Sequence, residues 1–258
     1  MPVLRFSAQV ARKMRRLLLI CGVAALALPG VASAATVQYS LPQLLAGGTQ
    51  SQGFTIGDKR YSGFEFSSTG SHPLVPSDVN VKVTSSETNA AIPGDDTYAL
   101  QFTFGMDAFP GERTDLVLSY RVDVLDPTQF INRVGLGFNG SVPSQGPGAA
   151  AASVIETVST AASGLDGPPV APGSTSDTAI IDVFNDGPGR LADDNQDSIA
   201  VNPTRTLFFV KDILVSSSQT GGYVAVSVVD NVINQIPEPS VIGLMALAGG
   251  GLLFRRRR

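Results

Sequence analysis

The chain has 258 residues, of which 16% are charged, and it contains 27 glycines, 17 prolines and no tryptophan. Sparse charge with abundant Gly and Pro favours short strands joined by turns and argues against long helices. The single cysteine, Cys21, excludes a disulfide framework, and the single histidine, His72, leaves oxygen atoms as the ligands for any metal site.

Residues 1–34 have the order of an export signal. A basic segment precedes an apolar run at residues 17–28, which is followed by a Pro-Gly breaker and the small residues Ala32-Ser33-Ala34. We expect the translocon to accept the apolar run. We also expect signal peptidase, whose pocket fits the side chains of Ala32 and Ala34, to cut after Ala34.

Processing changes the charge of the protein. The first 34 residues carry five of the 18 cations and none of the 22 acidic residues, so removing them leaves 13 against 22, a net charge of −9. Removing the four terminal arginines as well leaves 9 against 22, or −13. Such an acidic domain repels nucleic acid, so we expect no nucleic-acid partner. The sequence leaves open whether Met1 or Met14 is the true start.

Residues 35–235 show the two-residue period of half-buried strands. Within residues 116–124, every second residue is apolar and most of those between are polar. We therefore expect an all-β ectodomain, an antiparallel β-sandwich with one shared core. Further strands are predicted at residues 60–66, 79–84, 98–104, 131–138, 152–158, 178–184, 205–215 and 222–233.

Residues 141–177 have a different composition, because Ala, Ser, Gly and Pro occupy 24 of these 37 positions. This bias predicts a long mobile insertion with one embedded strand around residues 154–158.

One acidic segment has part of the spacing of a calcium loop. Asp193, Asn195 and Asp197 stand at alternate positions, where their oxygens could converge on Ca²⁺. Ser198 replaces the expected glycine, and Thr204 occupies the place of the bidentate glutamate. The alternative is a solvated acidic turn whose side chains bond the local backbone. No other cofactor is expected.

The sequence provides no pattern for catalysis. His72 is isolated in a loop, no G-x-S-x-G elbow is present, and the spacing of the 22 acidic residues selects no catalytic pair. We therefore expect no enzyme activity. A calcium- or carbohydrate-binding module and a secreted hydrolase remain as alternatives.

The C-terminus has the features of a second membrane signal. Pro237-Glu238-Pro239 is followed by an apolar segment, predicted as a transmembrane helix at residues 240–254, and by four arginines at 255–258. Its 14 apolar residues span about 21 Å as a helix, less than the roughly 30 Å hydrocarbon core. Cationic flanks stay in the cytoplasm, so both ends of the precursor would face the cytoplasm and the ectodomain would lie outside.

The ordered features of residues 236–258 resemble the PEP-CTERM sorting signal. The resemblance implies recognition by an exosortase, cleavage near Pro237-Glu238-Pro239, and transient tethering to the inner membrane. It also implies delivery to the cell surface or extracellular matrix of a Gram-negative bacterium that makes exopolysaccharide, a further candidate partner. The residues expected to hold the tail for cutting are Arg255, Arg256, Arg257 and Arg258.

A second resemblance lies within the ectodomain. Residues 134–140, 152–158 and 210–213 are similar to segments of ectodomains common among PEP-CTERM proteins. No activity is assigned to that group, so this similarity implies the β fold only.

Overall fold

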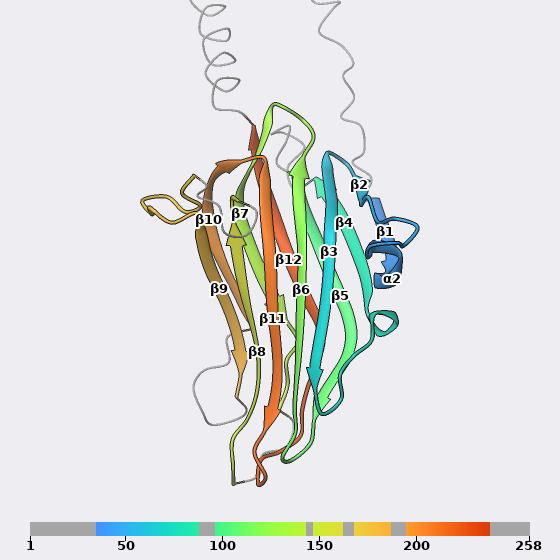
Figure 1. Ribbon diagram of the computed structural model, residues 1–258. Coiled ribbons are helices and arrows are strands. Elements are labelled where there is room, and N and C mark those ends of the chain that lie inside the picture. Colours follow the sequence, from blue (N-terminus) through green and yellow to red (C-terminus); the bar gives the residue numbers. More distant parts are fainter. Residues whose placement is uncertain (1–34, 88–95, 143–146, 162–167, 187–194, 238–258) are drawn as a thin grey trace, which may run out of the picture. The chain divides into compact units, whose positions relative to one another are not determined.

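The computed structural model describes residues 35–87, 96–142, 147–161, 168–186 and 195–237 (Figure 1). The predicted signal peptide and the predicted transmembrane helix lie outside these ranges. Within the described ranges, no helix is both long enough and apolar enough to cross a membrane.

The structure consists of two six-stranded antiparallel sheets, which confirms the predicted all-β class. Two short helices, α2 (Leu41–Leu44) and η1 (Pro76–Asp78), accompany them. The first sheet, sheet A, has the order β1 (Ala35–Ser40), β4 (Asn80–Glu87), β5 (Asp96–Ala108), β12 (Val224–Pro237), β7 (Gln129–Phe138), β10 (Gln196–Thr204). The second, sheet B, has the order β2 (Phe54–Ile56), β3 (Lys59–Gly70), β6 (Arg113–Val124), β11 (Thr206–Ser217), β8 (Ala150–Ser159), β9 (Thr178–Asn185).

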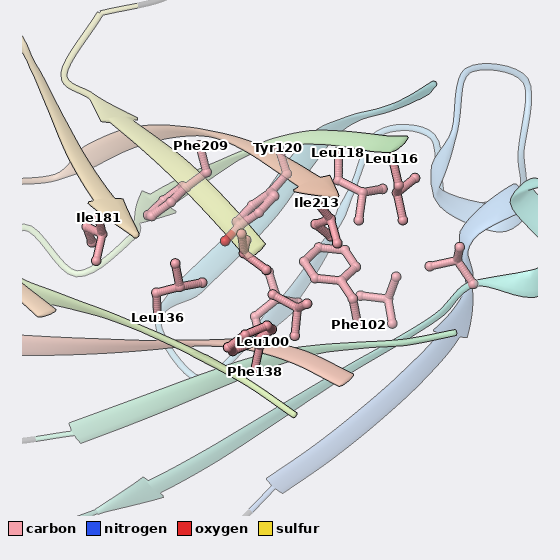
Figure 2. Close-up of a cluster of buried hydrophobic side chains, with 14 of the residues drawn as sticks. Leu100, Phe102, Leu116, Leu118, Tyr120, Leu136, Phe138, Ile181, Phe209 and Ile213 are labelled. Atoms are coloured by element: carbon pink, nitrogen blue, oxygen red, sulfur yellow. The ribbon is translucent and has the colours of Figure 1, made fainter. Parts of the chain in front are cut away.

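One hydrophobic core joins the two sheets. Figure 2 shows Tyr120 and Phe209 of sheet B pointing toward Phe102 and other side chains of sheet A. The ring of Tyr120 stacks on Phe209 at 4.8 Å between centroids and meets Phe102 of the opposite sheet at 5.7 Å. The apolar face that alternation predicts on β6 therefore faces the interior of a sandwich.

Three strands are present that the sequence pattern does not predict: β1, β2 and β10. The third, β10, includes Asp197, which was assigned to a calcium loop or an acidic turn. It forms a strand because it pairs with β7 along the edge of sheet A, where Asp197 lies opposite Leu136.

Part of the segment 141–177, which is rich in Ala, Ser, Gly and Pro, contributes more to the fold than its composition predicts. The strand expected around residues 154–158 is β8, which extends from Ala150 to Ser159 and lies between β11 and β9 inside sheet B. Ala150 and Ala152 are core residues with 3% and 0% exposure. Small apolar side chains therefore line this part of the sandwich interior.

Candidate functional site

Most of the predicted processing and metal residues lie outside the part of the chain that the structure describes. These residues are Ala32, Ala34, Asp193, Glu238, Pro239, Arg255, Arg256, Arg257 and Arg258. Pro237 is described, and it is the last residue of β12, opposite Gln129 of β7.

The structure describes two of the three predicted calcium ligands. The backbone carbonyl of Asn195 accepts a hydrogen bond from the Phe138 N–H at 3.1 Å, and the side-chain Oδ1 of Asp197 accepts one from the Ser198 N–H at 2.6 Å. Both groups thus bond the backbone where β10 begins. Among the described residues, no group of three or more His, Cys, Asp or Glu side chains could hold a metal ion. The calcium site stays a prediction, because Asp193 is not described.

The two ends of the described chain lie at the same end of sheet A. Ala35 pairs with Ser85, Ser85 with Tyr98, and Tyr98 with Ile233 of β12. The first residue of β1 is therefore in register with a residue close to the end of β12, which ends at Pro237. Both predicted cleavage points thus adjoin one end of the sandwich.

A groove of about 440 Å³ lies on the outer face of sheet A, over β10, β7 and β12. Its floor is β7, where Gly135 and Gly137 alternate with the buried residues Val134, Leu136 and Phe138. The outward positions of β7 therefore carry no side chains there, whereas the strands on both sides do. A glycine strand between two side-chain-bearing strands makes a trough along β7.

The walls of the trough follow from the strand register. On β10, Gln196 lies opposite Gly137 and Ser198 opposite Gly135. On β12, Asp230 lies opposite Gly137 and Val232 opposite Gly135.

One end of the trough is closed by Arg133. Its guanidinium donates a hydrogen bond to Ser198 Oγ at 2.7 Å, which fixes it across the β7–β10 pair. Asn234 lies opposite Arg133 on β12 and donates to Thr97 Oγ1 at 3.3 Å. Two polar side chains with fixed orientations therefore line this end.

Asp230 is the acidic group that leans over the floor. A Cβ added to Gly137 would lie 2.9 Å from Asp230 Oδ1. In the described part of the chain, no hydrogen bond or ion pair joins the Asp230 carboxylate to another side chain. Burial raises the pKa of this carboxyl, although the positive charge of Lys211 acts in the opposite direction. A hydrogen bond from the backbone N–H of Asp230 itself also acts to lower this pKa, so the carboxylate retains acceptor capacity toward the trough but is not wholly unbonded.

The raised pKa of Asp230 predicts a pH dependence of stability. A carboxyl whose folded pKa exceeds its ordinary 3.8 binds more protons in the folded state, so stability falls as pH rises from 3.8 through the folded pKa. Asp212, whose pKa is also raised by burial, acts in the same direction. We expect Asp230→Asn to reduce this loss of stability, measured by urea unfolding at a series of pH values. An unchanged slope would contradict the assignment.

Beneath the trough lies a buried polar network that joins the two sheets. Lys211 of β11 donates a hydrogen bond to Glu156 of β8, and both side chains are fully buried. Asn231 of β12 donates to Glu156 Oε1 at 2.6 Å and to the Gly135 carbonyl at 3.1 Å. Tyr120 of β6 donates to Asn231 Oδ1 at 2.6 Å. The network therefore ties the floor of the trough to sheet B.

Burial perturbs the ionisable groups of this network. It lowers the pKa of Lys211, against the opposing effect of the Glu156 carboxylate, and it raises the pKa of the Tyr120 hydroxyl. Desolvation disfavours the charged form of each group. The lysine nevertheless has a carboxylate partner within hydrogen-bonding distance, so the pair satisfies itself in the core.

Neither the network nor the trough is predicted by the sequence. The sequence does indicate the burial of the charged pair, because both residues fall on the apolar positions of a two-residue alternation. Glu156 lies on the same face of its strand as Val154 and Val158, and Lys211 on the same face as Phe209 and Ile213. A charge at a core-phase position indicates a buried, paired group. The trough had no such local signal, since it depends on the register of three strands.

Comparisons with known proteins identify no family for the chain. No protein-family model and no curated protein matches it. Among solved structures, it is similar to a carbohydrate-binding module studied for mannan recognition, TmCBM27, at 9% identity and a TM-score of 0.24, covering 80% of this chain and 97% of that one.

Two further solved structures are similar at the same low level. One, from infectious bursal disease virus Gx strain, has 17% identity and a TM-score of 0.28, covering 84% of this chain and 53% of that one. The other belongs to a study of promiscuous carbohydrate-binding modules of the β-sandwich superfamily, with 10% identity and a TM-score of 0.20, covering 76% and 72%. TM-scores this low assign no function to the chain.

Proposed function

We propose that this chain is an exported, non-catalytic surface or extracellular-matrix protein. Signal peptidase removes residues 1–34, and residues 240–254 hold the protein briefly in the inner membrane. An exosortase then cuts near Pro237-Glu238-Pro239 and releases the sandwich outward. The proposal includes no cofactor.

One observation supports this topology: β1 begins at the end of sheet A where β12 finishes. The two predicted membrane segments lie close to these strand ends: six residues, 29–34, separate the apolar run at 17–28 from Ala35, and two residues separate Pro237 from the segment at 240–254. β12 has 14 residues, a length of about 46 Å at roughly 3.3 Å per residue. If the two strand ends lay at opposite ends of the sheet, one of them would need a linker of that length to reach the same membrane, and this arrangement needs only the short connections present.

Mass spectrometry of the two ends of the mature protein tests the proposal. We expect the first residue to be Ala35 and the last to fall within residues 237–239. Cutting earlier would remove residues of β12 that pair with β7. Recovery from the cell surface of a chain that retains residues 240–258, or recovery of the intact precursor from the cytosol, would contradict it.

A further inference from the structure

We propose that the trough on sheet A binds a neutral polysaccharide chain that lies along β7. This proposal extends the function proposed above by naming a ligand for the surface protein. The binding itself does not require the sorting steps. The observation that carries it is a polar groove of about 440 Å³ whose floor lacks side chains and whose walls carry them.

The lining matches the hydrogen-bonding chemistry of sugar hydroxyls. A hydroxyl both donates and accepts, so a site for polyols needs both kinds of partner. Asp230 supplies an acceptor, and Arg133 supplies donors. Gln196 and Asn234 each carry an amide that can do both. These groups stand at both ends of the trough and on both walls, as contacts to successive hydroxyls along a chain require.

The shape of the trough also fits a chain. From Arg133 to Gly137 the floor spans about 13 Å at roughly 3.3 Å per residue. Its volume falls within the range of about 300–1,000 Å³ that is usual for ligand sites. Val232, directly opposite Gly135, provides an apolar surface for the C–H groups of a sugar ring.

Charge selects neutral polysaccharides over anionic ones. The full-length chain carries a net charge of −4, and the chain without residues 1–34 and 255–258 carries −13. The trough itself adds the carboxylates of Asp197 and Asp230 to the single cation of Arg133. A polyanion would be repelled. No aromatic side chain lines the trough in the described part of the chain, so stacking adds nothing. We therefore expect weak binding at a single site, which many copies on one surface would strengthen through avidity.

Gly135→Val provides a selective test of the trough. A Cβ at this position would meet Val232 and Ser198 at 3.7 and 3.8 Å, which are ordinary contacts. The Cβ of the new side chain therefore fits without a clash, its two methyl groups occupy the floor of the trough, and a β-branched residue suits a strand. Gly137 is a poorer choice, because a Cβ there would approach Asp230 Oδ1 to 2.9 Å.

The same sheet offers a matched control. Gly105 lies on β5 at an exposed position, away from the trough lining, and a Cβ there would meet nothing within 4 Å. Gly105→Val therefore makes the same chemical change on sheet A and leaves the trough intact. Melting temperatures of both variants would verify that each is folded.

Native affinity electrophoresis of the full-length chain measures binding. The chain is solubilised in a detergent without a sugar headgroup, since such a headgroup would compete for the trough. The gels contain galactomannan, xyloglucan, dextran or laminarin as neutral probes and alginate as the anionic probe. We expect at least one neutral polysaccharide to retard the protein, Gly135→Val to weaken this at least about tenfold, and Gly105→Val to leave it unchanged.

Three outcomes would overturn the proposal: no retardation by any neutral probe, equal retardation of Gly135→Val and the unmodified chain, or stronger retardation by alginate. If Gly135→Val fails to fold, Gln196→Ala serves instead, because Gln196 is an exposed wall residue. Gln196→Ala is expected to weaken retardation, and unchanged retardation would count against the site. Processing of the chain in cells is measured separately, so failure of the trough and failure of the sorting proposal can be told apart.

Discussion

Replacing Glu156 with alanine is expected to lower the free energy of unfolding by about 3–5 kcal/mol. Glu156 and Lys211 are both fully buried, and each supplies the charge that compensates the other. Without the carboxylate, Lys211 must either keep an uncompensated charge in the core or lose its proton. Asn231 also loses the acceptor at 2.6 Å. Urea unfolding followed by circular dichroism measures the change.

A double variant distinguishes two quantities: the destabilisation caused by leaving Lys211 without its carboxylate, and the net contribution of the Glu156–Lys211 pair to the free energy of unfolding. Glu156→Leu combined with Lys211→Met removes both charges and keeps apolar volume in the core. Such replacements are often neutral or stabilising, so we expect the double variant to be more stable than Glu156→Ala. Glu65→Ala, an exposed change on β3, is the control, with an expected effect below about 0.5 kcal/mol. A Glu156→Ala effect as small as the control would refute the assigned role.

The position of the network gives it a structural role beyond stability. Asn231 lies on sheet A, yet it bonds Tyr120 and Glu156 of sheet B as well as the carbonyl of Gly135. These bonds form only when the two sheets face each other in one register. Buried polar groups can specify one arrangement where apolar contacts would permit several. The network therefore holds the trough floor in place on the core.

The strands that the sequence predicts well are those with strong alternation. In β6, Leu116, Leu118 and Tyr120 are buried as their two-residue period predicts. β10 was missed because it is a polar edge strand that begins Gln196-Asp197-Ser198. Its strand conformation comes from pairing with β7, a tertiary effect that local propensity does not include.

The trough was beyond prediction for a related reason. Gly135 and Gly137 read in the sequence as weak points of a strand. They become the floor of a groove only because β10 and β12 flank β7 in a particular register, with Gln196 and Asp230 both opposite Gly137. A one-residue slip would turn these side chains to the other face. The burial of Glu156 and Lys211 could have been predicted from the two-residue alternation of their strands. That these two residues pair with each other, across β8 and β11, could not.

Replacing all four terminal arginines with glutamate is expected to block processing of the precursor, with the cut product falling at least about tenfold. The 14-residue apolar run is short for a membrane span, so its cytoplasmic flank must supply the anchoring charge. Glutamates at positions 255–258 remove that charge, and the tail then passes through the membrane or fails to insert. Immunoblots of cell fractions against an epitope in the ectodomain measure the ratio of precursor to product.

Lysines at the same four positions keep the charge and are expected to preserve most processing. Normal surface delivery of the glutamate variant would show that the tail does not direct sorting, whereas a defect shared by the lysine variant would point to recognition of the arginine side chain itself.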